Sequence, residues 1–243
     1  MTVNAASRVA FFDVDETLIA TKSMFAFLAH YLRAQGEPGS TYERLTGELH
    51  QAAAAGTPRH EINRRYYQLY KGRSVASLAA AGRDWFEDSL DGLFLDQPLS
   101  HLEAHRDAGT PVVLLSGSFF ACLDPVAEHT GATWAIGTRP LMRRGELTGD
   151  VLVPMIGDRK GRAANAVAGV LGVSLKESYA YGDHASDLAL LSCVGNPHVI
   201  GDDPVLKAEA EQHGWPRLSD TPRPTIPEPV YAAQQPGPAP MST

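Results

Sequence analysis

Short runs of apolar residues, each ending in a polar loop, recur along the chain. The first covers residues 8–12 (RVAFF) and stops at Asp-Val-Asp-Glu-Thr, and the second covers residues 111–115 (PVVLL) and stops at Ser-Gly-Ser. A third covers residues 178–181 and stops at Gly-Asp, and two more candidates lie at residues 194–200 and 134–136. Runs of this length are typical of strands buried in a parallel sheet.

Helical patterns lie between these predicted strands, notably at residues 101–108 and 161–171 (GRAANAVAGVL). Short apolar strands that alternate with helices predict an α/β fold, in which a parallel sheet is covered on both faces. Residues 141–153 have poor hydrophobic alternation, but Arg144-Gly145 at their centre makes them a candidate hairpin.

The stretch between the first two strands breaks this alternation, because it contains helical patterns and no strand. Glycine and proline residues separate the four segments, which are residues 23–35, 41–55, 59–70 and 75–89. Four consecutive helices with short connections predict a small antiparallel bundle inserted after the first strand. We therefore divide the chain into a helical cap (residues 22–92), an α/β core (residues 1–21 and 93–218) and a terminal tail.

The tail, residues 219–243, is rich in proline and poor in large apolar residues. Such a composition cannot bury enough apolar surface to compensate for the entropy lost on ordering. The sequence therefore predicts an extended, disordered tail.

Composition narrows the classes of function. The chain has 243 residues, of which 44% are hydrophobic, enough for one sizeable α/β domain with an accessory element or for two small domains. Its formal net charge of -7 argues against a nucleic-acid or anionic-membrane partner. Two distant cysteines do not make a disulfide framework or a zinc site. Because the sequence has neither a signal-peptide pattern nor an apolar stretch of ~20 residues, we expect a cytoplasmic protein.

Polar side chains that could carry out chemistry follow three of the predicted strands. They are Asp13 and Asp15, Ser116, and Asp183 with Asp187, and Lys160 stands at the start of a predicted helix. In an open α/β sheet, ligands bind outside the carboxyl ends of the strands. These groups can therefore meet in one crevice although they are distant in sequence.

Phosphoryl transfer is the reaction that suits this set. It needs a site that neutralises a phosphate, holds it in line with a nucleophile and protonates the departing oxygen. Asp13 is the candidate nucleophile, since a carboxylate can form an aspartyl phosphate. Asp15 is close enough to protonate the leaving oxygen and then to deprotonate the hydrolytic water. Because two anions repel, we expect Mg2+ between Asp13 and the phosphate, held by Asp13 and Asp183.

Three further groups would bind the phosphate itself. Lys160 adds a second positive charge, while the Ser116 hydroxyl and the backbone amides from Gly117 onward are neutral donors. Each group alone has an ordinary explanation: Ser116 as a helix N-cap, Lys160 as a surface lysine, Asp183 as a cap. The combination favours a site, because every group falls at a strand end or helix start and the charges are complementary.

In these motifs the sequence resembles the haloacid dehalogenase superfamily, and most of all its phosphoserine-phosphatase-like branch. The first motif of the family, Asp-x-Asp-x-Thr, is residues 13–17 here, and the second, an apolar strand ending in serine, is residues 112–116. Gly117-Ser118, which follows, is typical of this branch. The third motif, a lysine ahead of a helix, is best matched by Lys160, and the fourth, Gly-Asp-x-x-x-Asp, is residues 182–187.

The resemblance covers residues 8–215 and implies a Rossmann-like parallel sheet core with an inserted four-helix cap. It implies a magnesium-dependent phosphatase that acts on a small phosphorylated metabolite, with Asp13 as nucleophile and Asp15 as acid and base. The metal would be held by the side chains of Asp13 and Asp183 and by the backbone carbonyl of Asp15.

The resemblance also assigns supporting positions. Asp187 is expected to orient Lys160 and the metal-bound waters, and Thr17 is expected to support the site from behind the ligands. His184 stands where the family often has a small residue, and we expect it to pack rather than to contact the substrate. Lys22 stands where phosphoserine phosphatases carry a glutamate that binds the substrate's amino group. If Lys22 contacts the substrate rather than solvent, it favours a carboxylate, a second phosphate or several hydroxyls.

Two other functions use the same residues. A phosphotransferase or phosphomutase would pass the phosphoryl group from Asp13 to an alcohol instead of water, and the sequence does not separate these from a phosphatase. A non-enzymatic phosphate-accepting switch would also use an aspartate cluster and magnesium. The helical insertion argues against the switch, since a lid that excludes water serves catalysis on a small molecule.

Overall fold

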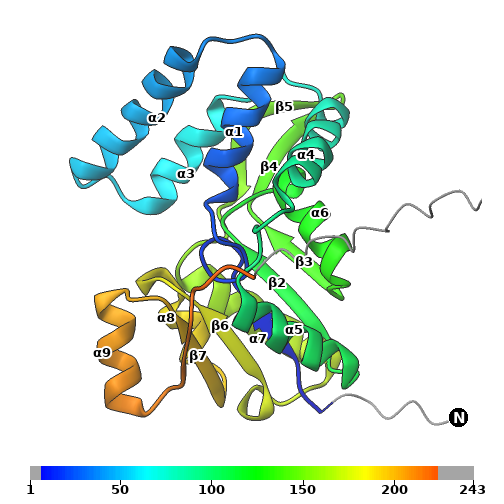
Figure 1. Cartoon of the computed structure of the whole chain (residues 1–243), viewed down its shortest axis with the longest axis vertical. Helices are drawn as coiled ribbons and strands as arrows, with labels where there is room; N and C mark the ends of the chain where they lie inside the picture. Colours follow the sequence, from blue (N-terminus) through cyan, green and yellow to red (C-terminus); the bar gives the residue numbers. More distant parts are fainter. Residues whose placement is uncertain (1–6, 224–243) are drawn as a thin grey trace, which may run out of the picture.

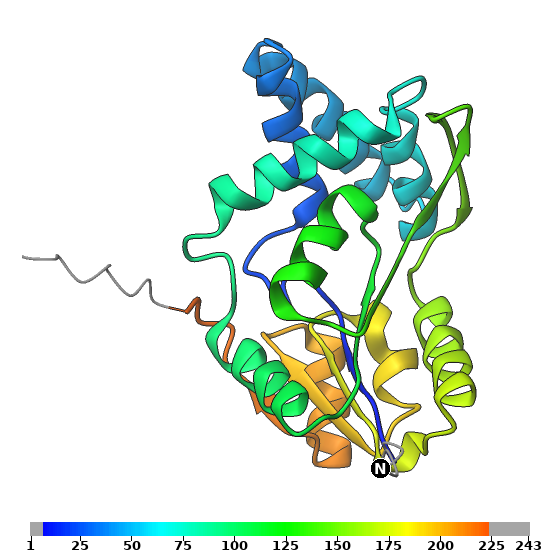
Figure 2. The ribbon, with the colours of Figure 1, turned by 90° about the vertical axis from the view of Figure 1, so that its right-hand side faces the viewer.

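A six-stranded parallel sheet forms the base of the molecule, in a computed structural model that describes residues 7–223 (Figures 1 and 2). The strand order is β3-β2-β1-β6-β7-β8. The strands are β1 Ala10–Phe12, β2 Val112–Ser116, β3 Trp134–Gly137, β6 Tyr179–Gly182, β7 Asn196–Ile200 and β8 Arg217–Leu218. The α/β fold predicted from the sequence is confirmed, and each predicted strand is present with shifts of a few residues at its ends.

Two apolar layers cover the faces of this sheet, and alternate strand residues contribute to each. Phe12 and Leu114 point into one layer with Leu102 of α5 (Asp96–Asp107). Phe11 and Val113 point into the other. Helices α7 (Asp158–Leu171), α8 (Leu188–Leu191) and α9 (Pro204–His213) pack on this second face, as do the residues around the 3-10 turn Leu175–Glu177. None of the helices in residues 7–223 is long and apolar enough to cross a membrane.

Helices α5 and α7 begin earlier than the sequence indicates. Helix α5 starts at Asp96, five residues before the predicted start, and α7 starts at Asp158 after Gly157, whose φ is 62°. An acidic residue lies in the first turn of each helix, where it interacts favourably with the helix dipole. Lys160 is consequently inside the first turn of α7 rather than ahead of the helix.

The four predicted cap helices are all present above the carboxyl edge of the sheet (Figure 2). They are α1 Ser23–Ala34, α2 Gly39–Ala54, α3 Arg59–Gln68 and α4 Val75–Ser89. The candidate hairpin also forms, from β4 Arg139–Arg143 and β5 Glu146–Val153, and β5 lies against α3. Helix α6, Phe120–Thr130, packs on α4 so closely that a Cβ at Gly82 would lie 1.9 Å from the Ala121 carbonyl oxygen. The cap helices thus pack on segments that follow β2 and β3 in sequence.

Two linkers join the cap helices to the sheet, and they pair with each other. Ala20 N donates to the Leu93 carbonyl at 2.7 Å, and Leu95 N donates to the Leu18 carbonyl at 3.0 Å. The second linker also pairs with the start of the predicted tail, since Asp96 N donates to the Thr221 carbonyl at 2.9 Å. Residues 219–223 and the two linkers thus form a strip of three paired segments, and the prediction of a disordered tail is wrong for residues 219–223. The rest of the predicted tail, residues 224–243, lies outside the described part of the chain.

Arg223 fixes the end of the strip to α5. Its backbone N–H donates to the Phe94 carbonyl at 2.7 Å, and its guanidinium contacts Asp96 and Glu103, each at 3.0 Å. The guanidinium meets both carboxylate oxygens of Glu103, an arrangement that is geometrically specific as well as charge-assisted.

We expect truncation after Leu218 to lower the melting temperature, because it removes the backbone pairing and the Arg223 ion pairs. A loss of roughly 1–2 kcal/mol in the free energy of unfolding corresponds to about 2–8 °C in melting temperature for a chain of this size. The matched control ends after Arg223 and keeps these hydrogen bonds, so differential scanning fluorimetry of both chains isolates residues 219–223. Equal melting temperatures would show that the strip adds no stability.

Candidate active site

Three polar strand ends meet at the carboxyl edge of the sheet. Phe12 is paired with Leu114 on one side and with Tyr181 on the other, so β1, β2 and β6 end at nearly the same level. Asp13 follows the first of these strands, Ser116 ends the second, and Asp183 follows the third. The parallel register therefore brings together side chains that are separated by most of the chain.

Lys160 is buried between two carboxylates. Its Nζ lies 2.7 Å from Asp13 Oδ1 and 2.6 Å from Asp187 Oδ1. All three side chains are less than one tenth exposed. Burial alone would lower the pKa of Lys160, but the charges of Asp13 and Asp187 outweigh it and raise the pKa above its ordinary value. Lys160 is therefore a fixed ammonium group beside Asp13.

Asp13, Asp183 and Asp187 form an acidic cluster whose carboxylate oxygens lie within 4.8 Å of one another. When all three carboxylates are ionised, they leave a surplus of two negative charges over the single Lys160 ammonium. Burial, together with the charge of Asp187, raises the pKa of Asp13 well above its ordinary value and that of Asp183 to about 6. A divalent cation would relieve this repulsion, and hard oxygen ligands of this kind are those that Mg2+ prefers. The donor set therefore fits magnesium.

Thr17 and His184 hold the loops around this cluster. Thr17 Oγ1 donates to Asp183 Oδ1 at 2.8 Å, and Asp183 Oδ2 takes no part in this hydrogen bond. His184 Nδ1 accepts the Ser186 N–H at 2.9 Å, and the Asp187 carboxylate accepts the His184 N–H at 3.3 Å. His184 thus caps the 3-10 turn Ala185–Asp187 and is not among the residues that line the cavity beside the site.

Asp15 lies where the chain leaves the sheet for the cap. Its Oδ1 accepts the backbone N–H of Ser23, the first residue of α1, at 3.0 Å. Burial raises the pKa of Asp15, and the hydrogen bonds from Ser23 only partly oppose this. Ser23 in turn donates its hydroxyl to Ser118 Oγ at 2.9 Å. The Asp15 carboxyl is therefore tied to both the cap and the loop after β2.

The loop after β2 is closed on itself, since Ser118 N donates to Ser116 Oγ at 3.0 Å. Ser116 and Ser118 are fully buried, whereas Gly117 lines a cavity. This cavity, of about 110 Å³, has Asp13, Asp15 and Lys160 at its base. Of the predicted site residues, Asp13, Asp15, Lys22, Gly117 and Lys160 line this cavity between the sheet and the cap, whereas Ser116, Asp183 and Asp187 lie behind its lining.

Helix α3 contributes residues to this cavity that are not among those predicted from the sequence. Arg59, Ile62, Asn63 and Tyr66 all line it, and their spacing places them on one face of the helix. Arg59 also reaches the core, where its Nη1 donates to Ser186 Oγ at 3.4 Å. That periodicity is visible in the sequence, but nothing in it shows that this face is turned toward Asp13.

The remaining walls of the cavity combine apolar and charged groups. Met24, Phe25, Leu49 and Ile156 line it, and so does Lys22. Lys22 Nζ lies 3.2 Å from Glu16 Oε2, and about half of each of these two side chains is exposed. Lys22 is therefore placed at the rim of the cavity, paired with a carboxylate.

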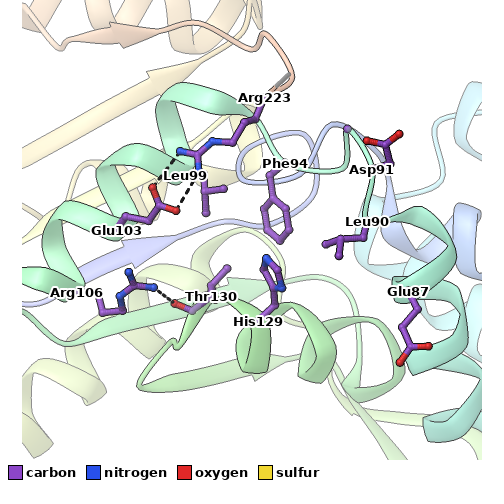
Figure 3. Close-up of a pocket in the computed structure, with 11 residues that line it drawn as sticks. Glu87, Leu90, Asp91, Phe94, Leu99, Glu103, Arg106, His129, Thr130 and Arg223 are labelled. Carbon is purple, nitrogen blue, oxygen red and sulfur yellow. Dashed lines mark hydrogen bonds and ion pairs between the residues drawn. The ribbon is translucent and has the colours of Figure 1, made fainter. Parts of the chain in front are cut away.

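A larger cavity, of about 530 Å³, lies elsewhere, between α4, α5 and α6 (Figure 3). Phe94 and His129 stack in it with ring centroids 5.2 Å apart, and the Arg223–Glu103 ion pair lies at one side. None of the strand-end carboxylates lines this cavity. Size alone would select it, but the acidic cluster and Lys160 identify the smaller cavity as the candidate active site.

Comparison with protein families agrees with this geometry. The model of the haloacid dehalogenase-like hydrolases matches residues 10–192, which include every motif residue described above. The chain belongs to this family. A Mycobacterium tuberculosis protein named as a probable phosphatase is 31% identical over 226 residues, covering 90% of this chain and 77% of the relative. The phosphoserine phosphatase SerB1 of the same species is 30% identical over 217 residues, covering 85% and 68%.

Solved structures share the fold of this chain. A protein of unknown function from Bordetella pertussis superposes with a TM-score of 0.79 at 25% identity, covering 88% of this chain and 99% of the other. A phospho-aspartyl intermediate analogue of phosphoserine phosphatase superposes with a TM-score of 0.65 at 19% identity, covering 89% and 95%. The protein is a phosphatase of the haloacid dehalogenase type, in the phosphoserine-phosphatase-like branch.

We expect Asp183→Asn to weaken magnesium binding at least ~10-fold, because the amide keeps the shape of the side chain but removes a charge from the cluster. Isothermal titration calorimetry with MgCl2 measures this without turnover. Asp150→Asn, an exposed aspartate of β5, is the matched control and should bind like the wild type. Equal affinity in both variants would show that Asp183 is not a ligand.

Proposed function

We propose that the protein hydrolyses a small phosphomonoester through an aspartyl phosphate on Asp13, with Mg2+ as cofactor. The observation that carries the proposal is the placement of the Asp13 carboxylate at the base of a cavity under the cap. It lies 2.7 Å from the Lys160 ammonium and beside the Asp183 and Asp187 carboxylates. Phosphoryl transfer needs this combination of a nucleophile and neutralising charge.

In the first step a carboxylate oxygen of Asp13 attacks phosphorus and the bond to the leaving oxygen breaks. Asp15 gives its proton to that oxygen, and its raised pKa favours the protonated form that this needs. Lys160, Ser116 and the amide of Gly117 would bind the phosphoryl oxygens. Bound Mg2+, held by Asp13, Asp183 and the Asp15 carbonyl, would offset the negative charge of the phosphate.

In the second step Asp15, now a carboxylate, takes a proton from water, and the oxygen of that water attacks phosphorus. The bond between phosphorus and Asp13 breaks, inorganic phosphate leaves, and both carboxyl groups return to their starting states. A phosphotransferase would differ only in that an alcohol replaces the water. Product analysis with and without added alcohols separates the two activities. The position of the cavity under the cap favours an enzyme over a phosphate-accepting switch.

The walls of the cavity point to a class of substrate. Met24, Phe25 and Ile62 offer apolar surface next to the base. Lys22 and Arg59 bring two positive charges to its sides, against the single carboxylate of Glu16 that pairs with Lys22. We therefore propose a substrate whose organic part has an apolar segment and a carboxylate or second phosphate. The relative SerB1 is named for phosphoserine, whose ammonium group would be repelled by Lys22.

Asp13→Asn is expected to lower turnover of para-nitrophenyl phosphate at least ~1000-fold, because the amide is not a nucleophile. Asp15→Asn is the matched variant. It keeps the nucleophile but lacks the base for hydrolysis, and para-nitrophenol leaves with little need of an acid, so the phosphoenzyme should accumulate in a quench-flow burst. Activity retained in Asp13→Asn would refute the covalent mechanism.

Substrate choice should depend on the charge of Lys22. In a site partly shielded from water, reversing this charge changes the preference between cationic and anionic substrates by several kcal/mol at most. We expect the wild type to have a higher kcat/KM for phosphorylated acids that lack an ammonium group than for phosphoserine, and Lys22→Glu to shift the ratio toward phosphoserine by about 10-fold or more. Lys71→Glu, at an exposed position away from the cavity, is the control. An unchanged ratio would show that Lys22 does not select the substrate.

A further inference from the structure

One backbone carbonyl beside the active site accepts three hydrogen bonds. The Gly117 oxygen lies 2.9 Å from Asn63 Nδ2, 3.2 Å from the Tyr67 hydroxyl and 2.7 Å from Thr138 Oγ1. The three donor residues are at most 5% exposed. A carbonyl oxygen has two lone pairs, and a buried carbonyl needs one partner to be satisfied. The three donors exceed the one hydrogen-bond partner that a buried carbonyl needs.

The donors come from two parts of the fold. Asn63 and Tyr67 lie one turn apart on α3, a cap helix, whereas Thr138 follows β3 at the edge of the sheet. Thr138 also binds the next residue of the loop, since its backbone N–H donates to the Ser118 carbonyl at 2.7 Å. Burial raises the pKa of Tyr67 well above its ordinary value, so its hydroxyl keeps its proton at every working pH.

The Gly117 carbonyl shares its peptide unit with the N–H of Ser118. Because the peptide is planar and trans, fixing the carbonyl on one side fixes the N–H on the other. That N–H donates to Ser116 Oγ at 3.0 Å. Because Ser116 Oγ accepts this bond through one lone pair, its own hydroxyl proton is turned away from Ser118. No other side chain in the described residues accepts this hydroxyl proton.

We propose that Tyr67, Thr138 and Asn63 are positioning residues that act through the Gly117–Ser118 peptide to aim the Ser116 hydroxyl at the substrate's phosphate. The inference rests on the proposed phosphatase function. Because two of the donors belong to α3, packing of the cap and ordering of the phosphate-binding loop become one event. The cap then sets the affinity for phosphate, in addition to enclosing the substrate.

Tyr67→Phe and Thr138→Val test the proposal, since each removes one hydroxyl and neither residue lines the cavity. Asn63 lines the cavity and is left unchanged. The readouts are the dissociation constant of inorganic phosphate with Mg2+, measured by calorimetry, and kcat and KM for para-nitrophenyl phosphate. We expect each variant to bind phosphate about 3–10-fold more weakly and to lose kcat/KM by a similar factor.

Two control variants separate positioning from stability. Tyr70→Phe removes a buried hydroxyl from the next turn after Tyr67, one that contacts Tyr66 rather than the loop, and should bind phosphate like the wild type. Thr138→Ser retains the hydroxyl and should restore phosphate binding. Melting temperatures are measured for all variants, and if Thr138→Val does not fold, the comparison of Tyr67→Phe with Tyr70→Phe still decides.

The proposal is overturned if Tyr67→Phe binds phosphate as tightly as Tyr70→Phe while the wild type hydrolyses phosphomonoesters. It is also overturned if both variants, Tyr67→Phe and Tyr70→Phe, bind phosphate more weakly to an extent that follows the fall in their melting temperatures. A wild type that binds phosphate but hydrolyses no phosphomonoester would instead refute the proposed function, and the shift in phosphate affinity would still be measurable.

Discussion

Lys160 lies between Asp13 and Asp187, and all three side chains are almost completely buried. Removing isolated charges from water costs several kcal/mol each, so the ammonium and the carboxylates remain charged in this place only together. The pairing constrains the backbone, since α7 must start where Lys160 can reach β1, and the turn after β6 must bring Asp187 to the same point. Gly182 allows this approach, because a Cβ there would lie 2.7 Å from the Asp187 side chain. The negative charge left over after the pairing is what makes the site suitable for a divalent cation.

The cap is bound to this centre through hydrogen bonds as well as through apolar packing. Ser23, at the start of α1, donates to Asp15 and to Ser118, and α3 donates to the Gly117 carbonyl through Asn63 and Tyr67. The loops on which the chemistry depends are therefore shaped in part by an insertion that lies outside the sheet. A change within α1 or α3 can alter activity without touching a catalytic group.

Local patterns in the sequence were sufficient for the strands, for the cap helices and for the polar residues at the strand ends. Apolar runs such as residues 111–115 specify buried strands by themselves, and a parallel register then places their ends at one edge. The pairing of residues 219–223 with the second linker was not predictable in this way, since it depends on contacts between segments far apart in sequence. The face of α3 that carries Arg59 and Asn63 is periodic in the sequence, but only the packing of the cap turns it toward the cavity.

The strand order also has a consequence for how the chain acquires its structure. Strand β1 lies at the centre of the sheet and leaves the ribosome before the other strands, whereas its neighbour β6 follows much later. The hydrogen bond between Val9 and Ser178 spans 169 residues. Until β6 arrives, one edge of β1 has unpaired backbone groups and an apolar face, a state that is prone to association with other chains. Because the pairing closes a long loop, it is also slow. Strand β1, which leads into the proposed nucleophile Asp13, is thus a part of the nascent protein that needs protection.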